Sequence, residues 1–230
     1  MIRLDKYLAE AGVGTRSQVK KAIRDGHVKI NGEIAKHADI KVDEDHDIVQ
    51  FDDEEVWFSE FVYIMLNKPQ GYISASRGWD PNVIDLIAEP FRNLFPVGRL
   101  DKDTEGLLLI TNDGQLAHEL LSPKKQIEKE YYTEISVPLN DEDVEKIRNG
   151  ITWHEETYRP AEYKKISDYS CTLTVTEGKY HEIKRMIQAL GSEVTYLKRI
   201  RMKNLVLDET LKPGEYRFLS EEELNDLKAV

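Results

Sequence analysis

The segment between Gly98 and Gly106 holds the densest group of side chains that could do chemistry. It reads Gly98-Arg99-Leu100-Asp101-Lys102-Asp103-Thr104-Glu105-Gly106, and the apolar run Leu107–Ile110 follows directly. A carboxylate in a polar loop that leads into a rigid strand is well placed for catalysis. Asp101 is therefore a candidate catalytic residue, and a purely structural loop is the alternative because Asp and Gly are common in loops.

The same loop suggests a second chemistry, a metal site. Asp101, Asp103 and Glu105 have the alternating spacing with which a calcium loop begins. Such a loop needs a glutamate at its twelfth position, and that position is Asn112 here. We therefore expect no metal ion at these carboxylates.

A second charged segment, Glu177–Met186, enters a predicted helix. Apolar side chains recur at helical spacing from Ile183 to Leu190, which predicts a helix over 181–190 that Gly191 ends. Lys184 and Arg185 lie in its first turn, where the positive end of the helix repels cations. Because this position has a small electrostatic cost, it suggests a functional role for the two side chains. A solvated pair of charges is the simpler alternative. His181 could be a general base, but we expect it to cap the helix or to contact the substrate.

A third segment, Lys129-Glu130-Tyr131-Tyr132, opens a predicted strand. Adjacent residues of a strand point to opposite faces, so one tyrosine can pack in the core while the other faces a cleft. A tyrosine in a cleft can stack on a nucleic-acid base, whereas core packing of both rings is the alternative.

The elements that must position these segments mix strands and helices irregularly from residue 61 onward. This order favours an α+β domain on a mostly antiparallel sheet over a doubly wound fold. The single cysteine, Cys171, falls in an alternating run and is predicted to be a buried strand residue. Strands are predicted at 62–66, 107–112 (ended by a turn at 112–114), 130–137, 171–176, 194–198 and 204–207, and helices at 115–121, 141–149 (with Asn140 as the N-cap), 181–190 and 221–228.

Residues 1–51 are predicted to form a separate small domain of two helices and a hairpin. Thr15-Arg16-Ser17-Gln18 fits a capping box that opens the second helix, and Asn31-Gly32 is a strong hairpin signal. Outward-facing basic residues would give this domain one basic face: Arg3, Lys6, Arg16, Lys20, Lys21, Arg24 and Lys29. The acidic segment 52–60 is predicted to link it to a second domain over 61–230.

The net charge of −11 argues against a polyanionic partner, but the distribution of charge along the chain favours one. Residues 1–41 hold nine Lys and Arg against five Asp and Glu, and residues 176–205 hold seven against three. Basic faces on an acidic chain bind polyanions while limiting non-specific binding. The chain of 230 residues has no long apolar run, so we expect a cytoplasmic protein without a membrane segment.

Together these segments resemble a known family. Residues 3–48 resemble an S4 RNA-binding domain. Four motifs match those of the RsuA-type pseudouridine synthases in order and spacing: Leu66-Asn67-Lys68-Pro69-Gln70-Gly71-Tyr72, the Gly98–Gly114 segment, Lys129-x-Tyr131 and Glu177–Met186. The most specific of them is Gly-Arg-Leu-Asp-x-x-Thr-x-Gly-Leu-Leu, beginning at Gly98. The resemblance covers essentially the whole chain and implies an enzyme that converts a uridine of ribosomal RNA to pseudouridine.

The resemblance also implies roles for matching residues. Asp101 would be the essential catalytic carboxylate, Lys184 would pair with it, and Tyr131 would stack on the target uracil. Leu197 would line the pocket, and Arg99 would help to reshape the RNA. Glu182 departs from the family, which often has glutamine there, so we assign it no RNA contact. The further expected RNA contacts are Arg185, Lys179 and His181 and, on the N-terminal domain, Arg3, Arg16, Lys20 and Arg24.

Pseudouridine formation breaks the bond from ribose C1′ to uracil N1 and joins C1′ to C5. No redox change occurs, so we expect no cofactor. An ionised carboxylate is required, and Lys184 would favour that form of Asp101, whose exact step stays open. The expected partner is ribosomal RNA or a pre-ribosomal particle, with small-subunit (16S) RNA favoured, and the expected state is a monomer. The alternatives are a large-subunit (23S) enzyme and a non-catalytic S4 protein that binds ribosomal RNA during assembly. A metal-dependent hydrolase lacks a convincing ligand set.

Overall fold

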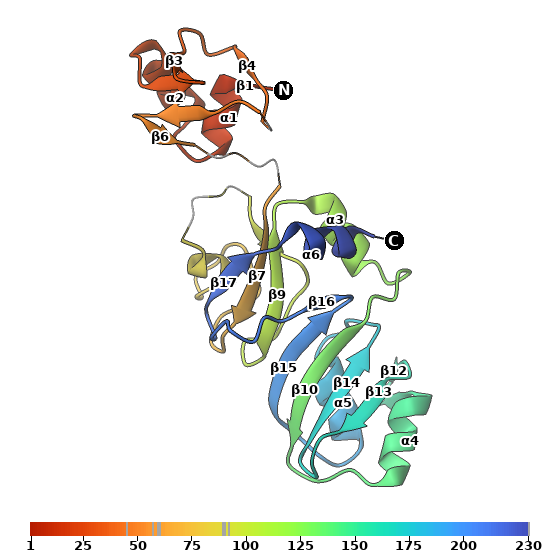
Figure 1. The fold of residues 1–230 in the computed structure, drawn as a ribbon. Coiled ribbons are helices and arrows are strands. Elements are labelled where there is room, and N and C mark those ends of the chain that lie inside the picture. Colours follow the sequence, from red (N-terminus) through yellow and green to blue (C-terminus); the bar gives the residue numbers. More distant parts are fainter. Residues whose placement is uncertain (45, 57, 59–60, 89–90, 92, 230) are drawn as a thin grey trace. The chain divides into compact units, whose positions relative to one another are not determined.

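The structure is a computed structural model that describes residues 1–44, 46–56, 58, 61–88, 91 and 93–229. The chain divides into two compact units (Figure 1), one of Met1–Val62 with Ala88–Leu94 and one of Tyr63–Ile87 with Phe95–Val230. Among the described residues, no helix is both long and apolar enough to cross a membrane.

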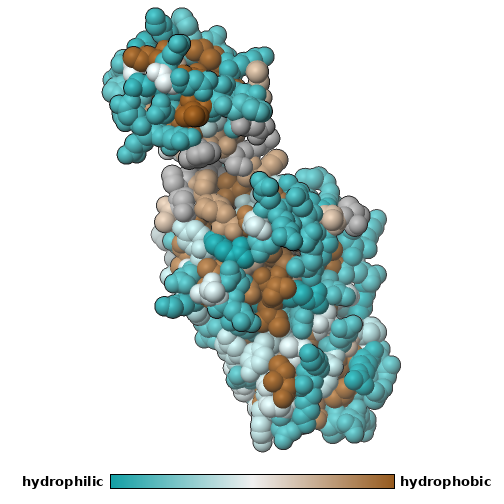
Figure 2. Space-filling model, viewed as in Figure 1, coloured by the Kyte–Doolittle hydropathy of each residue, from teal (hydrophilic) through white to brown (hydrophobic). Residues whose placement is uncertain are grey.

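The smaller unit packs two short helices against short strands. Its capping box is present as predicted, because the side chains of Thr15 and Gln18 bond each other's backbone amides. The Asn31-Gly32 turn is also confirmed, with both residues at positive φ. In the view of Figure 2 its surface is mostly hydrophilic, with a few hydrophobic spots. Its elements are β1 (Ile2–Arg3), α1 (Leu4–Glu10), α2 (Arg16–Arg24), β2 (Val28–Ile30), β3 (Glu33–Ile34), β4 (Lys41–Val42), β5 (Val49–Phe51) and β6 (Glu54–Glu55).

The prediction of an acidic linker over 52–60 is wrong at residues 52–55. Asp52 and Asp53 have φ angles of 48° and 68° and form a tight turn. Glu54–Glu55 then returns as β6 and pairs with β5 at the edge of a four-stranded sheet. A run of acidic residues is typical of a solvated linker. Asp also tolerates the left-handed backbone conformation of tight turns, so the same residues can form this hairpin. Residues 57, 59 and 60 of the predicted linker lie outside the described residues.

The described residues of the larger unit form a nine-stranded sheet in the order β13-β14-β10-β15-β9-β7-β17, with β16 beside β15 and β8 beside β9. Within it β15 and β9 are parallel and the other described pairs are antiparallel, which confirms the predicted α+β class. The strands are β7 (Tyr63–Lys68), β8 (Phe95–Pro96), β9 (Glu105–Thr111), β10 (Lys129–Ile135), β13 (Glu162–Lys165), β14 (Ser170–Val175), β15 (Val194–Met202), β16 (Leu205–Val206) and β17 (Tyr216–Phe218). Cys171 is buried in β14, as predicted.

The helices of the larger unit begin and end close to their predicted bounds. Asn140 caps α4 as predicted. The predicted turn at 112–114 is instead a helix start, because the Asp113 side chain accepts a hydrogen bond from the amide of Leu116. The helices are α3 (Gly114–Leu121), α4 (Asp141–Asn149), α5 (Glu182–Ala189), α6 (Glu221–Lys228) and a short 3₁₀ turn, η1 (Val83–Leu86); a separate hairpin pairs β11 (Ile151–Trp153) with β12 (Glu156–Tyr158).

Two hydrophobic clusters flank the central strands. One gathers Leu107 and Leu109 of β9 with α3 and α6, and the other gathers Leu173 of β14 with the apolar side of α5. The parallel pairing of β9 with β15 joins these halves. It requires Gly106, since a side chain there would collide with the backbone oxygen of Arg199.

Candidate active site

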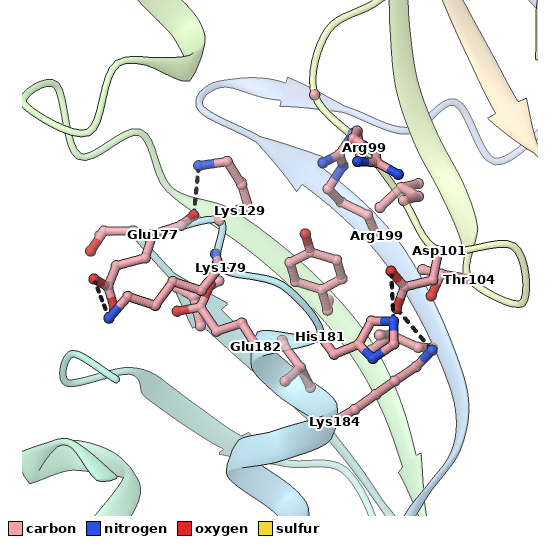
Figure 3. Close-up of a pocket in the computed structure, with 18 of the residues that line it drawn as sticks. Arg99, Asp101, Thr104, Lys129, Glu177, Lys179, His181, Glu182, Lys184 and Arg199 are labelled. Carbon is pink, nitrogen blue, oxygen red and sulfur yellow. Dashed lines mark hydrogen bonds and ion pairs between the residues drawn. The ribbon is translucent and has the colours of Figure 1, made fainter. Parts of the chain in front are cut away.

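The three segments singled out in the sequence line one cavity of about 550 Å³ in the larger unit. Its walls come from the loop before β9, from β10, from the connection between β14 and α5, and from β15 (Figure 3). The fold thus gathers side chains that are far apart in the sequence. Seven of the predicted site residues line the cavity: Arg99, Asp101, Tyr131, Lys179, His181, Lys184 and Leu197.

Asp101 lies on the cavity wall with its carboxylate paired to a lysine. The Lys184 ammonium, in the first turn of α5, donates to Asp101 Oδ2 at 2.9 Å and to Asp103 Oδ1 at 2.6 Å. Partial burial alone would lower the pKa of Lys184, but hydrogen bonds to the two carboxylates raise that pKa above its usual value. A positive charge therefore stays beside the Asp101 carboxylate at neutral pH.

The three carboxylates considered for a metal have different partners. Asp101 and Asp103 share Lys184, whereas Glu105 accepts a hydrogen bond from the Tyr196 hydroxyl at 2.5 Å. In the described part of the chain, no group of three His, Cys, Asp or Glu side chains is placed to hold a metal ion.

A buried lysine, Lys68, holds the backbone of the Asp101 loop. Its ammonium donates to the carbonyl oxygens of Pro69 and Asp101 at 3.0 Å and of Thr104 at 2.8 Å. Burial lowers the pKa of Lys68 to about 8. This lysine ends β7, so a neighbouring strand fixes the loop that carries Asp101.

The two adjacent tyrosines of β10 point to opposite faces, as predicted. Tyr131 lines the cavity, and burial raises the pKa of its hydroxyl. Tyr132 lies on the other face, where its ring contacts Tyr196 and its hydroxyl donates to Glu134 at 3.0 Å. One ring of the pair is therefore available to a ligand in the cavity.

His181 occupies the N-cap position of α5 but does not cap the helix with its side chain. Of the two expected roles of His181, capping by its side chain is therefore wrong, and contact with the substrate stays a prediction. Its backbone has a positive φ of 53°, and its ring stacks on Tyr180 with the ring centres 3.7 Å apart. This arrangement turns the imidazole toward Asp101, and Nε2 lies 3.5 Å from Asp101 Oδ1 (Figure 3).

A second group of polar side chains lines the same cavity. Lys129 is buried and donates to the carbonyl oxygen of Glu177 at 3.0 Å. Glu182 is also buried, which raises the pKa of its carboxyl to about 7. Arg199 donates through Nε to the Leu107 carbonyl at 2.7 Å, while its buried Nη2 has no hydrogen-bond partner among the described residues. This part of the cavity can hydrogen-bond a polar ligand.

Comparison with known proteins decides the family. A model of the family described as RNA pseudouridylate synthase matches residues 62–189, and a model of the S4 domain matches residues 2–48. The chain belongs to the RNA pseudouridylate synthase family. It is an RNA pseudouridine synthase of the RsuA type, an isomerase, and it carries an N-terminal S4 RNA-binding domain. The family resemblance of the sequence is thereby confirmed.

The synthase is similar over nearly its whole length to several named proteins. It is 47% identical over 233 residues to "Uncharacterized RNA pseudouridine synthase YtzG" of Bacillus subtilis, with 97% of each chain covered. It is 40% identical over 230 residues to "Ribosomal small subunit pseudouridine synthase A" of Haemophilus influenzae, covering 98% of this chain and 99% of the relative. A solved structure described as "Crystal structure of pseudouridylate synthase" is 41% identical with a TM-score of 0.70, covering 99% of this chain and 100% of that chain.

The remaining predicted site residues of the synthase lie outside this cavity. Arg185 forms an ion pair with Glu156 at 2.6 Å and lies over the Tyr180 ring. The four predicted RNA contacts of the S4 unit are exposed, but two of them, Arg3 and Lys20, pair with Asp5. Arg16 and Arg24 are exposed on α2.

Sequence reasoning did not assign a function to four buried polar residues of the synthase. They are Lys68, Lys129, Glu182 and Arg199, which hold the Asp101 loop or line the cavity. The sequence feature that they share, and that could have identified them, is a charged residue inside or next to an otherwise apolar strand or helix face. Such a residue is expected to be paired, because an unpaired charge is costly to bury.

Proposed function

We propose that this synthase isomerises one uridine of small-subunit ribosomal RNA, with Asp101 as its catalytic carboxylate. The observation that carries the choice of RNA is the 40% identity, along essentially the full length, to a protein named "Ribosomal small subunit pseudouridine synthase A". Relatives from Vibrio parahaemolyticus and Escherichia coli with the same name are 41% and 38% identical.

The chemistry assigns distinct tasks to the cavity residues. Asp101 acts on the nucleotide while the C1′–N1 bond breaks and the C1′–C5 bond forms. Lys184 donates a 2.9 Å hydrogen bond to Asp101 Oδ2 and places its positive charge beside the reacting carboxylate. The reaction rearranges bonds within one nucleotide, and these tasks require proton transfer and charge stabilisation.

The target base must leave its stack before it reaches Asp101, at a cost of a few kcal/mol. Tyr131 offsets this cost by stacking on the uracil, and Leu197 packs beside it. Arg99, which is exposed at the cavity, contacts the RNA around the vacated position, and Lys179 contacts the backbone nearby.

The S4 domain supplies most of the affinity. Its basic side chains neutralise phosphates and release counterions, which favours binding to a structured polyanion. We assign these contacts to Arg3, Arg16, Lys20 and Arg24, and a contact of the larger domain to Arg185. The working unit is a monomer on ribosomal RNA or on a pre-ribosomal particle.

Mapping pseudouridine in ribosomal RNA tests this proposal. RNA from cells with and without the gene is compared at every uridine, and the purified protein is then incubated with unmodified small-subunit and large-subunit RNA. We expect one small-subunit uridine to lose its modification without the gene and to regain it in vitro. A missing modification in large-subunit RNA alone would identify the other subunit as the substrate.

A further inference from the structure

The reaction needs a base at carbon C5 of the uracil, in addition to the group that acts while the C1′–N1 bond breaks. Once C1′ has joined C5, the hydrogen on C5 must leave as a proton before the uracil ring regains its double bond. We propose that the imidazole of His181 accepts this proton. The inference rests on the proposed role of Asp101, and it adds a proton acceptor to the same cavity.

The position of His181 places its ring beside the carboxylate of Asp101. The imidazole lines the cavity, and Nε2 lies 3.5 Å from Asp101 Oδ1. A uracil that reacts against Asp101 therefore comes within reach of the same ring. A general base acts at about 2.6–3.2 Å from the donor atom, or through one water molecule.

The orientation of the ring is maintained at a cost in backbone energy. His181 has a φ of 53°, which is uncommon for a residue other than glycine, and its side chain makes no capping hydrogen bond in return. The ring stacks on Tyr180 with an angle of 21° between the planes, and the Arg185 guanidinium lies 5.1 Å from the centre of the Tyr180 ring. Costly backbone conformations of this kind cluster at functional sites.

The other titratable groups around the cavity are less suited to this step. Lys184 is held protonated between Asp101 and Asp103. Burial raises the pKa of Tyr131, so its hydroxyl keeps its proton. The Glu182 carboxyl already accepts a hydrogen bond from the Lys179 amide at 3.3 Å. Glu182 is the rival base, and the experiment includes it.

The proton transfers balance without any co-reactant. The C1′–N1 bond breaks, the C1′–C5 bond forms, and the electron pair of the C5–H bond stays in the ring as the proton moves to the imidazole. The imidazolium releases a proton to solvent, and N1 takes one from solvent. Uridine and pseudouridine therefore have the same atoms, as an isomerisation requires.

The test uses the full-length enzyme and small-subunit RNA made with either ordinary or 5-deuterated uridine. His181→Gly is the informative variant, because glycine adopts a positive φ without strain and leaves room for added imidazole. We expect its single-turnover rate to fall on the order of 10²-fold or more. We also expect deuterium at C5 to slow this variant clearly but not the wild type, and imidazole to restore part of the rate.

Two further variants make the result specific. His154→Gly is the matched control, because His154 also has a positive φ and contacts a neighbouring aromatic ring, Trp153, but does not line the cavity. It should retain the wild-type rate. Glu182→Gln should show no deuterium effect, and such an effect in this variant instead of His181→Gly would overturn the proposal.

A slow His181→Gly enzyme with neither a deuterium effect nor imidazole rescue would also overturn it, because those results indicate a structural role. Failure of the proposed substrate would look different, since the wild-type enzyme itself would then form no pseudouridine in small-subunit RNA. In that case the same comparison is made on the large-subunit RNA that the mapping experiment identifies.

Discussion

Lys184 donates hydrogen bonds to two carboxylates, and their different exposure indicates which of them takes part in catalysis. The Asp101 side chain is 28% exposed and lines the cavity, whereas that of Asp103 is 70% exposed and does not. We predict that Asp101→Asn lowers turnover by several orders of magnitude while RNA binding stays largely intact, because the variant keeps the shape but loses the charge. Turnover is measured by pseudouridine formation, and affinity by filter binding.

The matched control for this prediction is Asp103→Asn, which also removes a carboxylate from Lys184 but leaves Asp101 in place. Its turnover should remain close to that of the wild type. An Asp101→Asn enzyme within tenfold of the wild type would contradict the assignment of Asp101.

Glu182 gives a prediction for stability against pH. Burial raises the pKa of its carboxyl to about 7 in the folded protein, above the ordinary value of 4.5. The folded state therefore holds this proton more tightly, so its contribution to stability is present below about pH 4.5 and is lost as the pH rises through about 7. The loss amounts to about 3 kcal/mol at most.

We predict that Glu182→Gln removes this loss, so that the variant gains stability relative to the wild type as the pH rises from 5 to 8. Urea unfolding of both proteins at several pH values measures the difference. A constant difference across that range would show that Glu182 does not titrate in it.

At the scale of elements, the close approach of β9 and β15 depends on Gly106. A side chain at this position would collide with the backbone of Arg199 and separate the two strands. We predict that Gly106→Ala unfolds the larger unit or lowers its melting temperature strongly. Gly114→Ala is the control, because nothing lies within 4 Å of the added carbon at the start of α3, and it should melt like the wild type.

The elements also show what could be predicted from sequence. Helices α4 and α6 and the long strands follow apolar periodicity, which extends over enough residues to be recognised. The two- to four-residue strands β8, β11, β12, β13 and β17 are too short for any pattern. The turn at Asp52 and Asp53 was not predicted, because acidic residues in succession are also typical of a linker. The roles of Lys68 and Arg199 depend on contacts across the sheet, which spacing along one segment does not specify.

At the scale of the whole molecule, affinity and chemistry are assigned to different domains. We predict that replacing Arg16, Lys20 and Arg24 together by alanine weakens RNA binding and flattens its salt dependence by up to about one unit of slope per lost contact. Saturated turnover should change much less, because Asp101, Tyr131 and Lys184 belong to the other unit. The measurement is a titration with a target-containing RNA fragment at several salt concentrations.

The control for this prediction removes the same charge elsewhere, through alanine at the exposed residues Lys164, Lys165 and Lys212. This control should bind with nearly the wild-type salt slope. Equal slopes for all three proteins would mean that the S4 residues make no phosphate contacts.

The three hydrogen bonds from Lys68 bear on whether the enzyme loop or the RNA changes shape when the two bind. The carbonyl groups of Pro69, Asp101 and Thr104 are held by the protein's own ammonium, so the shape of the loop does not depend on contacts with RNA. The distortion needed for reaction then falls on the nucleic acid, and a uridine already unpaired or poorly stacked costs less to extract. The local stability of the RNA, as well as its sequence, therefore determines which uridine the enzyme modifies.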